Sequence, residues 1–412
     1  MEAIRPPWIG GFNWSKDSLG NDWIGVSCQG EGAKIWFPCK DHPSDEPDSA
    51  AINITIPEEY YCASNGLLRN ISTPRAGFRT FHWFTGYPIN NYNINISIGK
   101  YEILSREYKA LDGRVMPVHY YVLPEARKHA DELLGMAVDM LYTYRKYYGE
   151  YPFTKEKFAI VHTDYLGMEH QTINAYGNNY RYTESNGIKW DGLMLHEMGH
   201  EWWGNKLTAA DFADLWLHEG ICSYGESLYQ LEKAGEDAYH EYMAKTKSKI
   251  QNNSPIIPKR NATTLDVYRG DIYTKGAFLM HSLRYILGDS LFFPTLKEFA
   301  TDSQYTYQNL VTTDDFIQLV NKNAGMDYSK LLNFYLYTTE YPKILIDSTG
   351  VDEFQISIPN IDFIIPMEVK LDNQSKRIEL SSEPITIHSE TKPLVDEKDW
   401  FLKEFIENKK IQ

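Results

Sequence analysis

The residues with the clearest potential for chemistry are two histidines and a glutamate in the middle of the chain. His196 and His200 stand four positions apart with Glu197 beside the first of them, in the pattern HExxH. On a helix, positions i and i+4 share one face, so both imidazoles point to the same place, as a zinc ion requires. Glu197 is then within reach of a water molecule at the metal without being a ligand itself. The pattern predicts a metal site with a general base next to it.

A third ligand is expected further along the chain, because catalytic zinc sites use three protein ligands and leave one position for water. Glu219 lies 19 positions after His200, in a second segment with helical spacing. A helical hairpin would bring its carboxylate to the metal. His218 is a weaker candidate, since neighbouring helical residues point about 100° apart. HExxH also arises by chance or on a charged helix face, but chance seldom adds a glutamate at this spacing. We therefore expect one Zn²⁺ per chain, held by His196, His200 and Glu219.

The segments that must position these residues differ in hydrophobic period along the chain. Residues 1–120 alternate apolar and polar side chains, most clearly at 51–56 and 92–98, which predicts strands. From 121 to 340 the apolar residues recur with helical spacing, including 124–148, 189–205 and 214–235. A period of two returns over 341–412. The layout predicts a multidomain α+β fold: an N-terminal β domain over 1–120, a mainly helical domain over 121–340, and a small C-terminal β module over 341–412.

The composition of the chain excludes several classes of protein. Its 412 residues are 42% hydrophobic and 24% charged, which is ordinary for a globular protein. A formal net charge of −15 argues against a nucleic-acid partner and against an anionic membrane surface. No run of 18 apolar residues is present, so no transmembrane segment is expected. The four cysteines form no CxxC pair, which favours buried thiols over a cysteine zinc site or disulfides.

The compartment is less strongly indicated. Met1–Pro7 lacks the basic and apolar pattern of a signal peptide, so a cytoplasmic location is the default expectation. An exported form is the alternative if the chain is truncated at its N-terminus. The sequence predicts no particular oligomeric state.

The pattern HExxH followed by Glu219 resembles that of the gluzincin metallopeptidases. The longer run 196–205 is similar to the M1 aminopeptidase family, including its aminopeptidase N and leukotriene A4 hydrolase branches. Three further segments match in family order: 166–170 is similar to the GxMEN exopeptidase motif, 272–277 to the YxKG segment, and 36–43 to a segment late in the N-terminal β domain. The resemblance implies a thermolysin-like catalytic domain between two β domains.

The chain also departs from the family pattern. Family members normally have many more residues before the segment at Trp36, and many have a large helical domain after the second β domain. The N-terminal β domain is therefore expected to be partial, and the helical C-terminal domain to be missing. Leu166 and His170 replace the first and last residues of GxMEN, whereas the glutamate of the motif is kept as Glu169.

The resemblance implies a role for each matched residue. Glu197 is the implied general base, and Tyr273 of the YxKG segment stabilises the developing oxyanion. Glu169 pairs with the α-ammonium group of the substrate, which is how an aminopeptidase recognises a free N-terminus. The other implied substrate-binding residues are Gly167, Met168 and Gln29.

Glu226 is a further candidate from its spacing. It lies seven positions after Glu219 and therefore on the same face of the predicted helix. It either orients a ligating histidine from behind or has a structural role.

The implied function is a zinc-dependent aminopeptidase that releases N-terminal residues from peptides with a free N-terminus. One alternative is a gluzincin endopeptidase with a more open cleft, which Glu169 disfavours because an anionic subsite selects free amines. Epoxide hydrolysis, known from one branch, is a minor alternative. The other class is a non-catalytic fragment or scaffold of the family, and bound metal distinguishes it from an enzyme.

Overall fold

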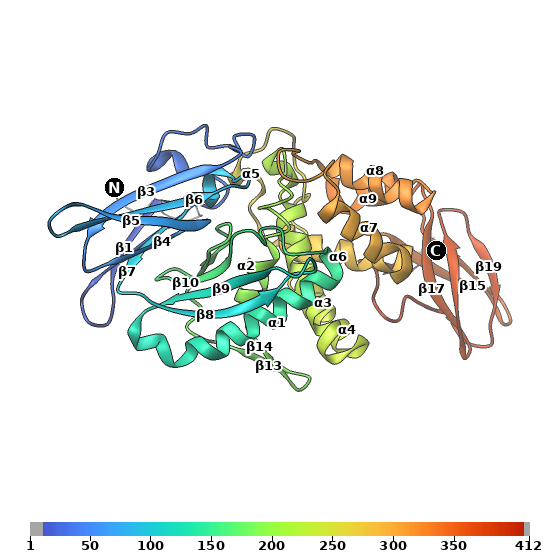
Figure 1. Ribbon diagram of the computed structural model, residues 1–412. Helices are drawn as coiled ribbons and strands as arrows, with labels where there is room; N and C mark the ends of the chain where they lie inside the picture. The colour runs from blue at the N-terminus through green and yellow to red at the C-terminus, as the bar shows by residue number, and fades with distance from the viewer. Residues whose placement is uncertain (1–10, 408–412) are drawn as a thin grey trace.

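The computed structural model describes residues 11–407, so the segment Met1–Pro7 and the last residues of the predicted module 341–412 lie outside the described part. β structure lies at both ends of the molecule (Figure 1), with the N-terminal strands in blue and the C-terminal strands in red. A sheet and most of the helices lie between them. The predicted multidomain α+β fold is confirmed.

The N-terminal strands form two antiparallel sheets. A four-stranded sheet has the order β1-β2-β7-β4, and a three-stranded sheet has the order β3-β6-β5. The strands of the first sheet are β1 (Gly11–Lys16), β2 (Asp22–Ser27), β7 (Ile96–Gly99) and β4 (Tyr61–Ser64). Those of the second are β3 (Ala50–Pro57), β6 (Phe78–Thr85) and β5 (Leu67–Arg75).

The strand predicted over 92–98 is only partly present. Asn91–Asn93 form a short 3-10 helix, and the strand begins at Ile96. Both the apolar and the polar residues of this segment are buried. The buried polar groups have partners inside the protein: the Asn93 side chain, for example, donates to Asn205 Oδ1 at 2.7 Å. The alternation of apolar and polar residues over 92–98 therefore does not separate a buried from a solvent-facing side, because the asparagines are buried as well.

A mixed sheet of five strands, in the order β11-β12-β10-β9-β8, packs through β11 and β12 against the helix that carries His196. Its strands are β8 (Glu102–Lys109), β9 (Val115–Val122), β10 (Phe158–His162), β11 (Gly167–Met168) and β12 (Asn174–Tyr176). The parallel pair β9 and β10 is joined by a 3-10 turn and by α1 (Ala130–Tyr148), which ends at Gly149 with φ 88°. Because β8 and β9 belong to this sheet, it continues across the boundary expected at residue 120.

The helices follow the predicted order, and the one that carries His196 and His200 is shorter than expected. Instead of a helix over 189–205, a small hairpin of β13 (Thr183–Ser185) and β14 (Ile188–Trp190) precedes an eight-residue helix α2 (Gly192–Gly199). The buried Trp202 and Trp203 follow in tight turns. The other helices are α3 (Trp216–Ala234), α4 (Glu236–Lys247), α5 (Thr264–Val267), α6 (Gly270–Leu287), α7 (Asp289–Thr301), α8 (Thr313–Ala324) and α9 (Ser329–Tyr337).

The C-terminal strands form two further sheets, in the orders β19-β16-β15-β21 and β18-β17-β20. The strands of the first are β15 (Lys343–Gly350), β16 (Glu353–Ser357), β19 (Ile385–His388) and β21 (Glu404–Ile406). Those of the second are β17 (Ile365–Leu371), β18 (Gln374–Leu380) and β20 (Leu394–Val395). Their buried residues, including Ile356 and Val369, belong to the same hydrophobic core as the helices, so this region packs directly onto the helical part.

The structure also bears on the expectations about transmembrane segments and about the cysteines. Within residues 11–407, none of the helices has the length and apolar character needed to cross a bilayer. All four cysteines lie in this range and are free thiols, and three of them are buried: Cys28, Cys62 and Cys222.

Two buried histidines are expected to make the fold sensitive to acid. Burial lowers the pKa of His162 to about 4 and that of His170 to about 3. Because an unfolded histidine titrates near pH ~6.5, the unfolded state binds more protons below that pH. The free energy of unfolding should therefore fall as the pH drops from about 6.5 towards 4, by up to about 1.4 kcal/mol per pH unit for each histidine.

Urea unfolding at several pH values between 7.5 and 5 measures this slope. His162→Asn should give a smaller slope than the wild-type protein, since it removes one of the buried histidines whose pKa is lowered. His388→Asn, at an exposed position on β19, is the matched control and should keep the wild-type slope. Equal slopes in all three proteins would contradict the assignment.

Candidate active site

The short helix α2 presents the HExxH residues. The Asp191 side chain caps its first turn by accepting a hydrogen bond from the Met194 amide at 2.9 Å. The helix is held from behind by Tyr144 of α1, whose hydroxyl donates to the Leu195 carbonyl at 2.9 Å. Although α2 ends at Gly199, His200 retains right-handed helical torsions, with φ −63° and ψ −19°. The i, i+4 geometry of His196 and His200 is therefore preserved.

Glu219 reaches the histidines from α3, which packs closely against α6. At their crossing, a Cβ atom on Gly220 would lie 2.9 Å from the Gly276 Cα atom. Only glycine at both positions permits this approach, because any side chain would push the backbones apart. The crossing lies one residue after Glu219 and three after Tyr273, so it sets the distance between these two side chains.

The three predicted ligand atoms converge on one point. His196 Nε2 lies 3.2 Å from Glu219 Oε2, His200 Nε2 lies 3.2 Å from the same oxygen, and the two nitrogens are 3.2 Å apart. Atoms in tetrahedral positions at about 2.0 Å from a zinc ion are separated by about 3.3 Å. Two imidazole nitrogens and one carboxylate oxygen are also the ligand types that zinc takes in catalytic sites. The arrangement fits a zinc ion.

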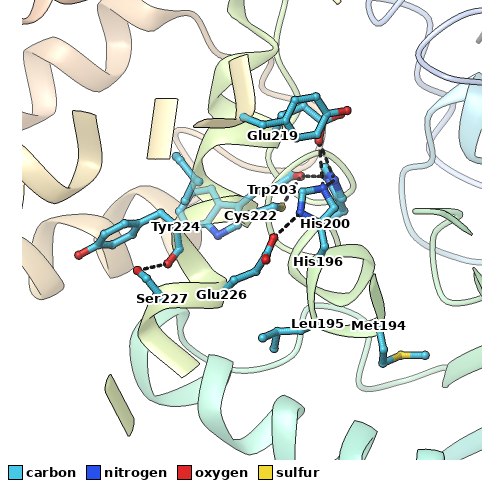
Figure 2. Close-up of polar contacts among 12 residues, drawn as sticks. Met194, Leu195, His196, His200, Trp203, Glu219, Cys222, Tyr224, Glu226 and Ser227 are labelled. Carbon is cyan, nitrogen blue, oxygen red and sulfur yellow. Dashed lines mark hydrogen bonds and ion pairs between the residues drawn. The ribbon is translucent and has the colours of Figure 1, made fainter. Parts of the chain in front are cut away.

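The second nitrogen of each imidazole has its own acceptor. His196 Nδ1 lies 3.0 Å from Glu226 Oε1, and His200 Nδ1 lies 2.9 Å from the Trp203 carbonyl oxygen. When both Nδ1 atoms carry a proton and donate to these oxygens, both Nε2 atoms present lone pairs towards Glu219. Figure 2 shows Glu219 on one side of the two rings and Glu226 on the other. Glu226, which spacing left undecided, therefore contacts a predicted ligand directly.

Replacement of Glu226 by glutamine is expected to weaken metal binding by about 10–100-fold, because the neutral amide no longer fixes the protonated Nδ1 of His196 as strongly. Competition with a chelator of known zinc affinity measures this change. Glu232→Gln, later on α3, is the matched control because Glu232 pairs with Lys146 and not with a histidine. Unchanged zinc affinity in Glu226→Gln would contradict an orienting role.

Two more carboxylates lie beside the three ligand atoms. One oxygen each from Glu169 and Glu197 and a nitrogen of His200 lie within 4.8 Å of one another. Burial raises the pKa of Glu197 and that of Glu169 above their ordinary values. Burial also acts to raise the pKa of Glu219, but its two histidine neighbours outweigh this and lower it. The site thus concentrates acidic groups that favour cationic ligands.

Gly167 is placed against the predicted general base. A Cβ atom on Gly167 would lie 2.5 Å from Glu197 Oε1 and 2.7 Å from Leu193 Cδ1. No larger residue fits without displacing the Glu197 carboxylate. The sequence assigned this glycine to substrate approach, and the structure adds that it leaves room for Glu197.

Tyr273 lies over the metal-ligand cluster from α6. Its ring stacks on the His196 imidazole with centroids 5.7 Å apart. Its hydroxyl donates to the Tyr268 hydroxyl at 2.6 Å, and Tyr268 in turn donates to Glu219 Oε1 at 2.8 Å. Gln29 Nε2 also donates to Glu219 Oε1, at 3.3 Å.

Sequence reasoning missed Tyr268. It precedes α6 and follows the short α5, so no helical period connects it to Tyr273 or to Glu219. Its hydrogen bond to Glu219 joins residues 49 positions apart, which no local pattern marks.

A cavity of about 530 Å³ opens beside this cluster. Six of the sequence-predicted site residues line it, and the remaining three, Glu169, His200 and Glu219, adjoin it through the contacts above. The six are Gln29, Gly167, Met168, His196, Glu197 and Tyr273. The structure therefore brings together the nine residues for which the sequence analysis expected a catalytic, metal-binding or substrate-binding role.

Comparison with known proteins agrees with this arrangement. Residues 133–335 match the family described as Peptidase family M1 domain, a segment that contains His196, Glu219 and Tyr273. Endoplasmic reticulum aminopeptidase 1 of Rattus norvegicus is 25% identical over 298 residues, which are 68% of this chain and 31% of that protein. The chain thus spans about a third of the length of this curated relative.

Solved structures share the fold at lower identity. Aminopeptidase A of Legionella pneumophila in complex with aspartic acid superposes with a TM-score of 0.79 and 18% identity, over 96% of this chain and 48% of that one. A mutant M1 zinc metallopeptidase of Deinococcus radiodurans, bound to a Tyr-Ser-Ala substrate, superposes with a TM-score of 0.68 and 23% identity. The match covers 83% of this chain and 74% of that one. Residues 133–335, which carry the HExxH residues and Glu219, are therefore identified as a Peptidase family M1 domain, and the solved structures show that the fold is shared.

Proposed function

We propose that the protein is a zinc-dependent aminopeptidase that removes N-terminal residues from peptides. The observation that carries the proposal is the convergence of His196 Nε2, His200 Nε2 and Glu219 Oε2 at mutual distances of 3.2 Å. The cavity beside these atoms is bordered by Glu197 and Glu169, which supply a base and an anionic subsite.

Zinc, when bound by these three residues, supplies Lewis-acid polarisation of the peptide carbonyl and a lowered pKa for water. Glu197 accepts the proton of the attacking water and then transfers it to the nitrogen of the leaving amine. The buried carboxylate suits this role, because its raised pKa lets it hold the proton between the two transfers.

Tyr273 and Glu169 act on the two ends of the reacting residue. The Tyr273 hydroxyl turns from Tyr268 to donate a hydrogen bond to the carbonyl oxygen as negative charge develops there. The Glu169 carboxylate accepts hydrogen bonds from the α-ammonium group, which places the first peptide bond over the metal site. Gln29 lines the same cavity and adds a polar contact near this end.

The alternatives from the sequence differ in how they use Glu169 and the metal. An endopeptidase would accept peptides whose N-terminus is blocked. A non-catalytic member of the family would have no need for Glu197 between two intact ligands. The complete set of ligands, base and anionic subsite favours the aminopeptidase over both.

The proposal is tested with fluorogenic amides of alanine, leucine and arginine beside their N-acetylated forms, with and without a zinc chelator. Chelator-sensitive cleavage of the free-amine substrates alone is the expected result. Glu169→Ala should lower kcat/KM for those substrates by about 10–100-fold, because a hydrogen-bonded charge partner of the ammonium is lost. Glu184→Gln, in the exposed hairpin, is the control. Cleavage of the acetylated substrates would exclude an aminopeptidase and favour the endopeptidase.

A further inference from the structure

A single positive charge stands at the edge of this otherwise acidic site. Arg269 is the position immediately before α6, and it lines the 530 Å³ cavity together with Glu197 and Tyr273. Among the described residues that line this cavity, it is the one arginine or lysine. Its side chain is exposed, so a ligand in the cavity can reach it.

The guanidinium is held in place without being neutralised. One terminal nitrogen, Nη1, donates to Ser254 Oγ, and the other, Nη2, donates to the Asp266 carbonyl oxygen at 2.6 Å. Neither acceptor is charged. A guanidinium has five N–H donors, so three remain for another group. Across residues 11–407, no carboxylate forms an ion pair with Arg269.

The two carboxylates nearest to Arg269 in the sequence have other partners. Asp266 pairs with Lys259 at 2.9 Å and accepts from the Thr263 amide at 2.8 Å. Asp271 accepts from the amides of Gln251 and Asn252, at 2.9 and 2.6 Å. Neither is free to neutralise the arginine, which is notable in a chain with a net charge of −15.

We propose that Arg269 binds a carboxylate group of the substrate, an inference that rests on the proposed aminopeptidase function. A guanidinium fixed by two neutral acceptors presents its remaining donors in a planar array, and a carboxylate is the group that matches such an array. Because α6 begins at Gly270, the positive end of its dipole adds to the attraction.

A peptide can supply this carboxylate in two ways. It is either the side chain of an acidic first residue, or the C-terminal carboxylate of a short peptide whose N-terminus is held at Glu169. In both cases the substrate is bound between an anionic subsite and a cationic one, and Arg269 is a specificity-determining residue.

The test measures binding by calorimetry in the zinc-loaded Glu197→Gln protein, which does not depend on turnover. Two matched peptide pairs separate the two sources: Glu-Ala-amide against Gln-Ala-amide, and Ala-Ala against Ala-Ala-amide. Arg269 should favour the charged member of one pair by about tenfold, the scale of a charge-assisted hydrogen bond at a solvent-exposed site. Adding Arg269→Ala should remove that preference, and Arg269→Lys should keep part of it. Arg181→Ala, at an exposed position outside the cavity, is the control for net charge.

Each result decides between the sources or overturns the proposal. If Arg269→Ala loses the preference for Glu-Ala-amide over Gln-Ala-amide, Arg269 binds the side chain of an acidic first residue. If it loses the preference for Ala-Ala over Ala-Ala-amide, Arg269 binds the C-terminal carboxylate. A preference that persists in Arg269→Ala, or the absence of any preference in the parent protein, overturns the proposal. The proposed function fails separately, if the wild-type protein cleaves none of the free-amine amides while these peptides still bind.

Discussion

Replacement of Glu197 by glutamine is expected to lower kcat by about 10²–10⁴-fold while zinc remains bound. The amide has the size of the carboxylate, so it fits the narrow space against Gly167, where a Cβ atom would lie 2.5 Å from Glu197 Oε1. It cannot accept the proton of the attacking water. The ligand atoms of His196, His200 and Glu219 are unaffected by the change, so the metal content should stay at the wild-type level.

The measurement combines steady-state hydrolysis of an alanyl or leucyl amide with metal analysis of the same protein sample. Glu184→Gln, an equivalent change on the exposed β13 strand, controls for the loss of one carboxylate. Activity within tenfold of the wild-type value in a zinc-loaded Glu197→Gln protein would show that another group accepts the proton. Loss of zinc in this variant would instead place Glu197 among the ligands.

Replacement of His200 by alanine is expected to abolish both zinc binding and activity. Catalytic zinc sites rely on three protein ligands, and His200 is a fully buried member of the set in this protein. Its loss also leaves the buried Glu219 carboxylate with one imidazole neighbour in place of two, which should lower the stability of the fold. The melting temperature should fall together with the metal content.

Metal analysis of purified protein should find about one zinc per wild-type chain and almost none in His200→Ala. After treatment with a chelator, adding zinc should restore the activity of the wild-type protein but not that of the variant. His388→Asn, on the exposed part of β19, controls for the loss of a histidine. Stoichiometric zinc in His200→Ala would show that the metal is bound elsewhere.

The sequence predicted correctly that the imidazoles of His196 and His200 lie together, because the rule it uses is local. The i, i+4 spacing of His196 and His200 needs only one helical turn, so it survived even though α2 is half the predicted length. Trp202 and Trp203 are buried although they lie beyond the end of that helix, and helical periodicity does not separate buried residues of a turn from those of a helix. The strand prediction at 92–98 was only partly right for a related reason, since buried, hydrogen-bonded asparagines have the same pattern as exposed ones.

The close approaches within the site depend on tertiary structure. Gly220 and Gly276 are 56 positions apart, and only the packing of α3 on α6 makes each of them necessary to the other. The hydrogen bond from Tyr268 to Glu219 likewise joins residues 49 positions apart that meet only in the folded chain. None of these contacts has a fixed sequence spacing.

By itself, the sequence determined which residues are candidates for the chemistry: two imidazoles on one helical face, the proposed carboxylate base between them, and a proposed third ligand and anionic subsite marked by family motifs. The tertiary structure alone decided how these groups are held and what surrounds them. It placed Gly167 against Glu197, supplied Glu226 as the partner of His196, and left Arg269 at the edge of the cavity with no ion pair to any residue of 11–407. The physical reason is that ligand type and helical period are encoded over a few residues, whereas packing distance and charge neutralisation depend on segments that meet only in the folded chain.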